Sequence, residues 1–182
     1  LLLLLAVAIL AVIGGLRWRD DAPRRAALAE VASFEAGIRL PHADITVPLP
    51  AGQPRILIGM DAAMVEMTGV AAPVGGEEAR AHWREHSLHA RPTVFEMEDG
   101  RYPVQKGMLA VPLYDALLTV AETLKERAQI SGEYDDEFRG QVIIALDHRL
   151  PWDTVVSTIY TAAQGQFSEF SLPVRGGGAV EY

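Results

Sequence analysis

One stretch near the C-terminal end constrains the fold most, because its hydrophobic pattern changes from strand to helix and back within residues 140–174. Residues 142–146 are an unbroken apolar run rich in β-branched side chains, which is typical of a strand buried on both faces. Pro151 suits the first turn of a helix, and residues 152–163 carry apolar side chains at helical spacing. Residues 170–174 alternate apolar with polar positions and predict a second strand. Together they predict a βαβ unit with a right-handed crossover.

The helix of this unit has an apolar stripe, which we assign to the core. Its members recur at i, i+3, i+4, i+7, i+8 and i+11: Trp152, Val155, Val156, Ile159, Tyr160 and Ala163. The aromatic residues Trp152 and Tyr160, with Phe167 and Phe170, could alternatively form a binding surface. Apolar side chains at helical or strand spacing are more often core, so we favour burial.

Composition narrows the classes of protein that the chain can belong to. With 182 residues, of which 49% are hydrophobic, the chain is long enough for one domain with a core and an additional leader or anchor. A net charge of −8 argues against a nucleic-acid partner, which would require a basic face. The absence of cysteine excludes disulfides and thiolate metal sites.

The N-terminal residues 1–16 are apolar and uncharged, and we predict a membrane anchor over residues 1–18. The chain does not begin with Met, so we expect this anchor to be truncated. A secretory signal peptide and a buried core helix are the alternatives. Four arginines follow the anchor, and the positive-inside rule would place their side in the cytoplasm. These residues are Arg17, Arg19, Arg24 and Arg25.

Shorter patterns predict the elements between the anchor and the βαβ unit. Residues 22–37 read as a helix that continues the anchor or forms a stalk, and residues 45–49 as an edge strand. A hairpin is expected at 56–67, and a second at 93–104 around the Asp99-Gly100 turn. We expect a short charged helix near 77–85 and a longer helix over 112–129.

Two groups of polar residues are candidate sites, and each has a structural alternative. His82, His86 and His89 have a spacing that could hold zinc on a helix, although a solvated helix face explains them better. Asp147 and His148 follow a buried strand, where α/β folds often place ligands. A turn with local capping is the better interpretation, because no nucleophile or phosphate loop accompanies them. We therefore predict no enzyme, no cofactor and no metal.

The C-terminal stretch also resembles the ExbD/TolR biopolymer-transport family, in which a buried strand ending in Asp precedes a turn, a helix and a last strand. The matching residues are Val142 to Leu146, Asp147, Pro151-Trp152, Val155-Val156, Ala162-Ala163, Gly165 and Phe167. Residues 45–50 are similar to the strand after the family's anchor, 56–68 to its central hairpin and 113–125 to its first helix. Residues 70–106 read as an insertion.

The resemblance implies an α+β fold, in which an N-terminal membrane helix is followed by a small mixed-sheet domain with two helices packed on the sheet. It divides the chain into an anchor (1–18), a juxtamembrane helix or linker (19–42), a periplasmic domain (43–175) and a flexible tail (176–182). The expected location is the bacterial inner membrane, with a single pass and the C-terminal domain in the periplasm.

The resemblance further implies an accessory subunit of a proton-motive-force-driven complex, which couples an ExbB/TolQ-type channel protein to a TonB/TolA-type periplasmic protein. The family's proton-carrying Asp lies in its membrane helix, and residues 1–18 contain no Asp. The alternative is a membrane-anchored binding or scaffold domain without a motor role. A homodimer is expected to pair by strand edges, through Ile45, Val47, Leu49, Phe170, Leu172 and Val174.

Overall fold

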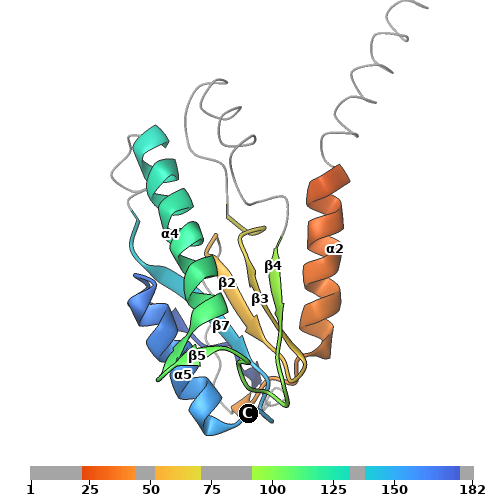
Figure 1. Cartoon of the computed structure of the whole chain (residues 1–182). Coiled ribbons are helices and arrows are strands. Elements are labelled where there is room, and N and C mark those ends of the chain that lie inside the picture. Colours follow the sequence, from red (N-terminus) through yellow and green to blue (C-terminus); the bar gives the residue numbers. More distant parts are fainter. Residues whose placement is uncertain (1–21, 44–51, 71–91, 132–137, 177–182) are drawn as a thin grey trace, which may run out of the picture.

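The computed structural model describes residues 22–43, 52–70, 92–131 and 138–176 (Figure 1). In these ranges the chain forms three helices, which are α2 (Ala22–Gly37), α4 (Val111–Ser131) and α5 (Trp152–Gln164). The strands are β1 (His42–Ala43), β2 (Arg55–Ile58), β3 (Ala62–Glu66), β4 (Thr93–Glu96), β5 (Gln105–Lys106), β6 (Leu109–Ala110), β7 (Gln141–Leu146), β8 (Glu169–Ser171) and β9 (Arg175–Gly176). None of the helices in the described ranges is both long and apolar enough to cross a bilayer.

The central sheet is mixed and has the strand order β4-β3-β2-β7-β8. The hairpin β2–β3 is antiparallel, as predicted, and β2 pairs in parallel with β7 over the whole of β2. The pair β7–β8 is parallel, which confirms the βαβ unit. The fold is therefore α+β, with the parallel pair β2–β7 at the centre of the sheet.

Alternate residues of the central strands face two separate cores. On one side Ile56, Ile58 and Ile144 pack under α4 and α5, together with Leu113 and Leu117 of α4. On the opposite side a smaller cluster forms under α2; it contains Leu57, Met64, Ala145, Val31 and Ile38. The sheet consequently lies between α4 and α5 on one face and α2 on the other (Figure 1).

The packing of α2 differs from the expected stalk or linker. Ala27 and Val31 are buried, and Arg55 of β2 binds Glu35 of α2 at 3.1 Å. At the end of the helix, the backbone amide of Arg39 donates to the Asp147 carboxylate at 3.1 Å. Three helices therefore pack on the sheet where two were predicted. The sequence could not show this, because every partner of α2 lies far along the chain.

The predicted second hairpin is only partly present. The Asp99-Gly100 turn forms, and a single bridge joins Glu98 to Arg101. The expected partner strand at 102–104 does not form, because β4 pairs with β3 at the sheet edge instead. Tyr102 turns inward, and its hydroxyl lies 2.7 Å from that of Thr158 on α5. Burial raises the pKa of Tyr102.

The assignment of the α5 apolar stripe to the core holds only in part. Val155 packs against the core and Val156 and Ile159 are half-buried, but the other members of the stripe are exposed, and α5 buries its hydroxyl side chains instead. The Thr154 hydroxyl donates to the Gly100 carbonyl, that of Ser157 donates to the Met108 carbonyl, and that of Thr161 accepts from the Ala110 amide. The buried positions of the helix are Thr154, Ser157, Thr158, Thr161 and Ala162. These bonds hold residues 100–110 against α5, which places the more apolar face of the helix outside.

The replacement Thr161→Val should lower the free energy of unfolding by about 1–3 kcal/mol, because it leaves the buried Ala110 amide without its acceptor. Thr119→Val is the matched control, since Thr119 is exposed on α4 and bonds only within its own helix. We expect Thr119→Val to lower the free energy of unfolding by less than about 0.5 kcal/mol. Urea unfolding followed by circular dichroism measures both, and equal effects would contradict a structural role for the Thr161 hydroxyl.

Candidate functional site

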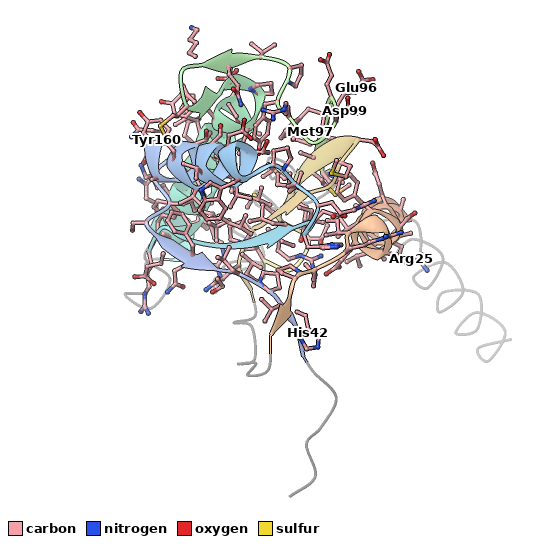
Figure 2. All side chains as sticks on the ribbon, turned by 90° about the horizontal axis from the view of Figure 1, so that it is seen from below. Arg25, His42, Glu96, Met97, Asp99 and Tyr160 are labelled. Atoms are coloured by element: carbon pink, nitrogen blue, oxygen red, sulfur yellow. The ribbon has the colours of Figure 1, made fainter. Side chains whose placement is uncertain are left out.

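The exposed side of α5 is the candidate site, and its residues follow from helical spacing. Trp152 is 76% exposed and Tyr160 is 40% exposed, on the side opposite the buried hydroxyls. Figure 2 shows Tyr160 at the outer margin of the molecule. We define the α5 outer face as Trp152, Val156, Ile159, Tyr160 and Ala163. This face carries no charged side chain; Trp152, Tyr160 and Ala163 are exposed, and Val156 and Ile159 are half-buried.

The β5–β6 hairpin lies beside α5 and has exposed apolar side chains of its own. Its turn is held by the bond from the Ser157 hydroxyl to the Met108 carbonyl at 2.7 Å. The side chain of Met108 is 48% exposed, and Val104 before the hairpin is also exposed. Clustered apolar side chains at a surface are typical of a protein or membrane contact, whereas isolated ones are ordinary.

The charges around the α5 outer face lie at its N-terminal end. Asp153 is the one charged residue of α5, and Arg101 binds its carboxylate from the neighbouring turn. The hydrogen bond from Arg101 holds the pKa of Asp153 below its usual value. Both side chains are well exposed, so this pair contributes little to stability and leaves the rest of the outer face uncharged.

The strand-edge residues proposed for an interface have different positions. In the described part of the sheet, β8 is an edge strand, as the interface prediction requires. Phe170 of β8 is half-buried and packs against the core, so only part of its side chain is accessible to a partner. Leu172 is 50% exposed just after β8, and Val174 is half-buried. Ile45, Val47 and Leu49 lie outside the described residues.

Asp147 shapes the turn after β7, as the capping interpretation predicted. Its buried carboxylate accepts from the Arg149 guanidinium at 2.7 Å, from the Arg149 amide at 3.0 Å and from the Arg39 amide. The bond from Arg149 is the main reason that the pKa of Asp147 lies far below its usual value. His148 is half-exposed, and its amide donates to the Arg39 carbonyl at 2.8 Å. The hydrogen bonds of this carboxylate therefore join the segment after α2 to the turn after β7.

Glu66 is the other buried carboxylate in the described ranges, and it too has structural partners. It accepts from Arg55 and from the amide and hydroxyl of Thr68. No cluster of metal-ligating side chains occurs in the part of the chain that the structure describes. His82, His86 and His89 lie outside that part. The site is accordingly a surface for contacts, built from apolar side chains.

Comparisons with family models, with curated proteins and with solved structures find no match to this chain. The function is therefore proposed from the chain's own residues and geometry together with the resemblance of its C-terminal stretch.

The sequence contained one signal of the outer face that the core interpretation overlooked. The side of α5 opposite the stripe carries Thr154, Ser157, Thr158 and Thr161, all uncharged and able to bond backbone groups. A helix with one apolar face and one hydroxyl-bearing face can bury either face. Here the hydroxyl-bearing face is buried because it bonds backbone carbonyl and amide groups in residues 100–110, which lie about 50 residues away in the sequence.

Proposed function

We propose that the chain is an accessory subunit of a proton-motive-force-driven inner-membrane complex that acts through protein contacts of its folded domain. In this role it joins an ExbB/TolQ-type channel protein to a TonB/TolA-type periplasmic protein. The observation that carries the proposal is the uncharged, exposed α5 outer face on a domain whose buried carboxylates, Asp147 and Glu66, are both used in structural contacts.

The order of elements also supports this proposal. The resemblance to the ExbD/TolR family leads us to expect a hairpin, a helix, a buried strand ending in Asp, a second helix and a last strand. The described residues have β2–β3, α4, β7 with Asp147, α5 and β8 in that order. Two strands, β4 and β5, lie inside the segment 70–106 that was read as an insertion, and β4 extends the sheet beyond β3.

A membrane-anchored scaffold without a motor role remains the second candidate. A scaffold would not need the proton-binding Asp of the family's membrane helix, and residues 1–18 contain no Asp. Both candidates use the same anchored, partner-binding domain, and they differ in whether a channel protein is bound.

The test is co-purification of the tagged full-length gene product, extracted from its own membranes in mild detergent. We expect a multi-helix channel protein of ExbB/TolQ type to be recovered in a fixed ratio. Recovery of the chain without a channel protein would favour the scaffold. The recovery is compared at two detergent concentrations. A specific complex keeps the same ratio of channel protein to tagged chain at both, whereas non-specific recovery of membrane proteins falls at the higher one.

The periplasmic location has its own test, which the absence of cysteine makes simple. The exposed residue Leu172 is replaced in a Leu172→Cys variant, and intact spheroplasts are treated with a membrane-impermeant maleimide. We expect labelling before permeabilisation. Labelling only after permeabilisation would place the domain in the cytoplasm, as the arginines after the anchor indicate by the positive-inside rule.

A further inference from the structure

We propose that α2 is a hinged cover of the sheet, which detaches as one unit while the rest of the domain stays folded. In the closed form α2 packs on the sheet, and in the open form it has swung away about a hinge at Gly37. The device belongs to the fold itself and goes beyond the proposed function.

The two faces of the sheet are held by cores of very different size. In the described ranges, the core under α4 and α5 contains eighteen buried hydrophobic residues, whereas the cluster under α2 contains five. Of these five only Val31 belongs to α2 itself, and Phe34 packs beside it half-buried. Because stabilisation grows with the apolar area that is buried, detaching α2 costs far less than separating α4 or α5 from the sheet.

The buried carboxylate on this side of the sheet keeps its partners when α2 leaves. Glu66 lies two residues after Met64 and therefore on the same face of β3. It accepts from Arg55 of β2 and from the amide and hydroxyl of Thr68, none of which belongs to α2. Glu35 of α2 binds Arg55 in a pair whose side chains are 26% and 48% exposed. Detachment therefore breaks an ion pair that contributes little and leaves no buried charge unpaired.

The contacts of α5 show what a permanently attached helix looks like in this domain. Its hydroxyls at Thr154, Ser157 and Thr161 bond backbone groups of residues 100–110. Removing α5 would leave these buried groups unsatisfied, which is expensive. The bonds of α2 itself to the sheet have no such buried backbone partner among the described residues, so α2 is the helix that can leave.

The hinge at Gly37 follows from the bonds beyond the helix. The Arg39 amide donates to the buried Asp147 carboxylate at 3.1 Å, and the Arg39 carbonyl accepts from the His148 amide at 2.8 Å. These bonds hold the segment after α2 to the turn after β7. Gly37 has no positive φ, and an added Cβ would meet no heavy atom of the described residues within 4 Å, so space does not require a glycine there. Its backbone freedom suits a hinge at the end of a helix.

Detachment changes how far the domain can reach. With 16 residues, α2 is about 24 Å long. Figure 1 shows it folded back along the sheet, with its Ala22 end at the top and its Gly37 end at the bottom. When α2 swings outward about Gly37, the upper end of the sheet moves away from Ala22 by up to about twice the helix length. A subunit that joins two proteins can then span distances that the closed form cannot.

The closed form predominates, because opening exposes apolar side chains of the sheet. Leu57, Met64 and Ala145 are all buried under α2. Opening of this kind is local unfolding, and its free energy lies below that of global unfolding. A chemical probe directed at a buried position under α2 therefore detects the open form although few molecules adopt it at any moment.

The experiment uses thiol labelling of buried cysteines, since the chain has none of its own. Met64→Cys places a thiol under α2. Met67→Cys is the matched control, because Met67 is similarly buried but belongs to the core under α4 and α5. The full-length gene product in mild detergent is treated with excess maleimide, without denaturant. We expect Met64→Cys to react at least about tenfold faster than Met67→Cys, because detachment of α2 is enough to expose it.

A second substitution separates detachment from global unfolding. Val120 of α4 is buried in the core under α4 and α5, which stays intact when α2 detaches. Val120→Ala should therefore accelerate the labelling of Met67→Cys about tenfold and leave the labelling rate of Met64→Cys unchanged.

Glu35→Ala tests the contact that holds α2 closed. It removes the ion pair with Arg55 and should accelerate the labelling of Met64→Cys about two- to fivefold. Glu30→Ala is the control, because Glu30 is an exposed glutamate of the same helix that bonds none of the described residues. It should leave the rate unchanged.

Three outcomes would overturn the proposal. Labelling of Met64→Cys no faster than that of Met67→Cys means that α2 does not detach separately. Equal acceleration of both cysteines by Val120→Ala means that the thiol under α2 is reached only by global unfolding. Equal effects of Glu35→Ala and Glu30→Ala mean that the ion pair does not hold α2 closed. None of these rates depends on recovery of the channel protein, so the hinged cover and the proposed function can fail separately.

Discussion

Replacing Asp147 by alanine is expected to lower the free energy of unfolding by about 3–5 kcal/mol. The buried carboxylate accepts from two backbone amides, those of Arg39 and Arg149, and pairs with the Arg149 guanidinium. Its loss leaves both amides unsatisfied and releases the end of α2 from the sheet. Urea unfolding of the full chain in mild detergent, followed by circular dichroism, measures the change.

Asp153→Ala is the matched control for this prediction. Asp153 is also an aspartate paired with an arginine, but both side chains of that pair are exposed. We expect the control to cost less than about 1 kcal/mol. A similar cost for the two variants would show that burial of Asp147 does not matter.

The same residue should make stability depend on pH in a defined direction. The pKa of the folded Asp147 lies below that of the unfolded carboxyl, which is about 3.9, so the unfolded state binds more protons in acid. The contribution is therefore present above the unfolded pKa and is lost progressively as pH falls from the unfolded pKa through the folded pKa. Asp147→Asn removes this contribution, so the difference in stability between wild type and variant should be largest above about pH 5 and should shrink steadily as pH falls below about 4. A constant difference would contradict the assignment.

The Gly140→Ala replacement is expected to have the second large effect, lowering the free energy of unfolding by about 3 kcal/mol. Gly140 has a φ of +65°, and an added Cβ would lie 2.7 Å from the backbone oxygen of Gln166. Its carbonyl also accepts from the amides of Ser168 and Glu169, which lead into β8. The methyl group must therefore move backbone, and β8 should separate from β7.

Gly107→Ala is the control that separates strain from contact. Gly107 has nearly the same φ, +63°, but an added Cβ meets no heavy atom of the described residues within 4 Å. We therefore expect Gly107→Ala to lower the free energy of unfolding by about 1–2 kcal/mol, which is the cost of the left-handed conformation alone. Hydrogen exchange should show early opening of β8 in the Gly140 variant alone. Equal losses would mean that the Gln166 contact is absent.

Elements with a local pattern were predictable from the sequence. The strand β7, the helices α4 and α5 and the hairpin β2–β3 each follow from a few neighbouring residues, and each is present in the structure. Their orientation was harder to predict. The apolar face of α5 was placed in the core because apolar periodicity is normally read as burial, and no local signal shows that Thr154 and Thr161 have backbone partners near residues 100–110.

The site was predictable only in part for the same reason. Asp147 was assigned correctly to a turn, since a polar turn after a buried strand requires capping. Its bond to Arg39 spans more than a hundred residues, and no spacing rule could reveal it. Phe170 was expected at an interface because residues 170–174 alternate as in an edge strand. In the structure, however, its side chain packs against the core.

The parallel pairing of β2 with β7 also determines when the domain can fold during synthesis. Arg55–Ile58 and Gln141–Leu146 form the centre of the sheet, but they are separated by more than eighty residues. Until the ribosome has released residue 146, β2 has an unpaired edge made of Ile56, Leu57 and Ile58, a short apolar segment of the kind that aggregates. We therefore expect the nascent chain to be most prone to aggregation over the interval between these two strands.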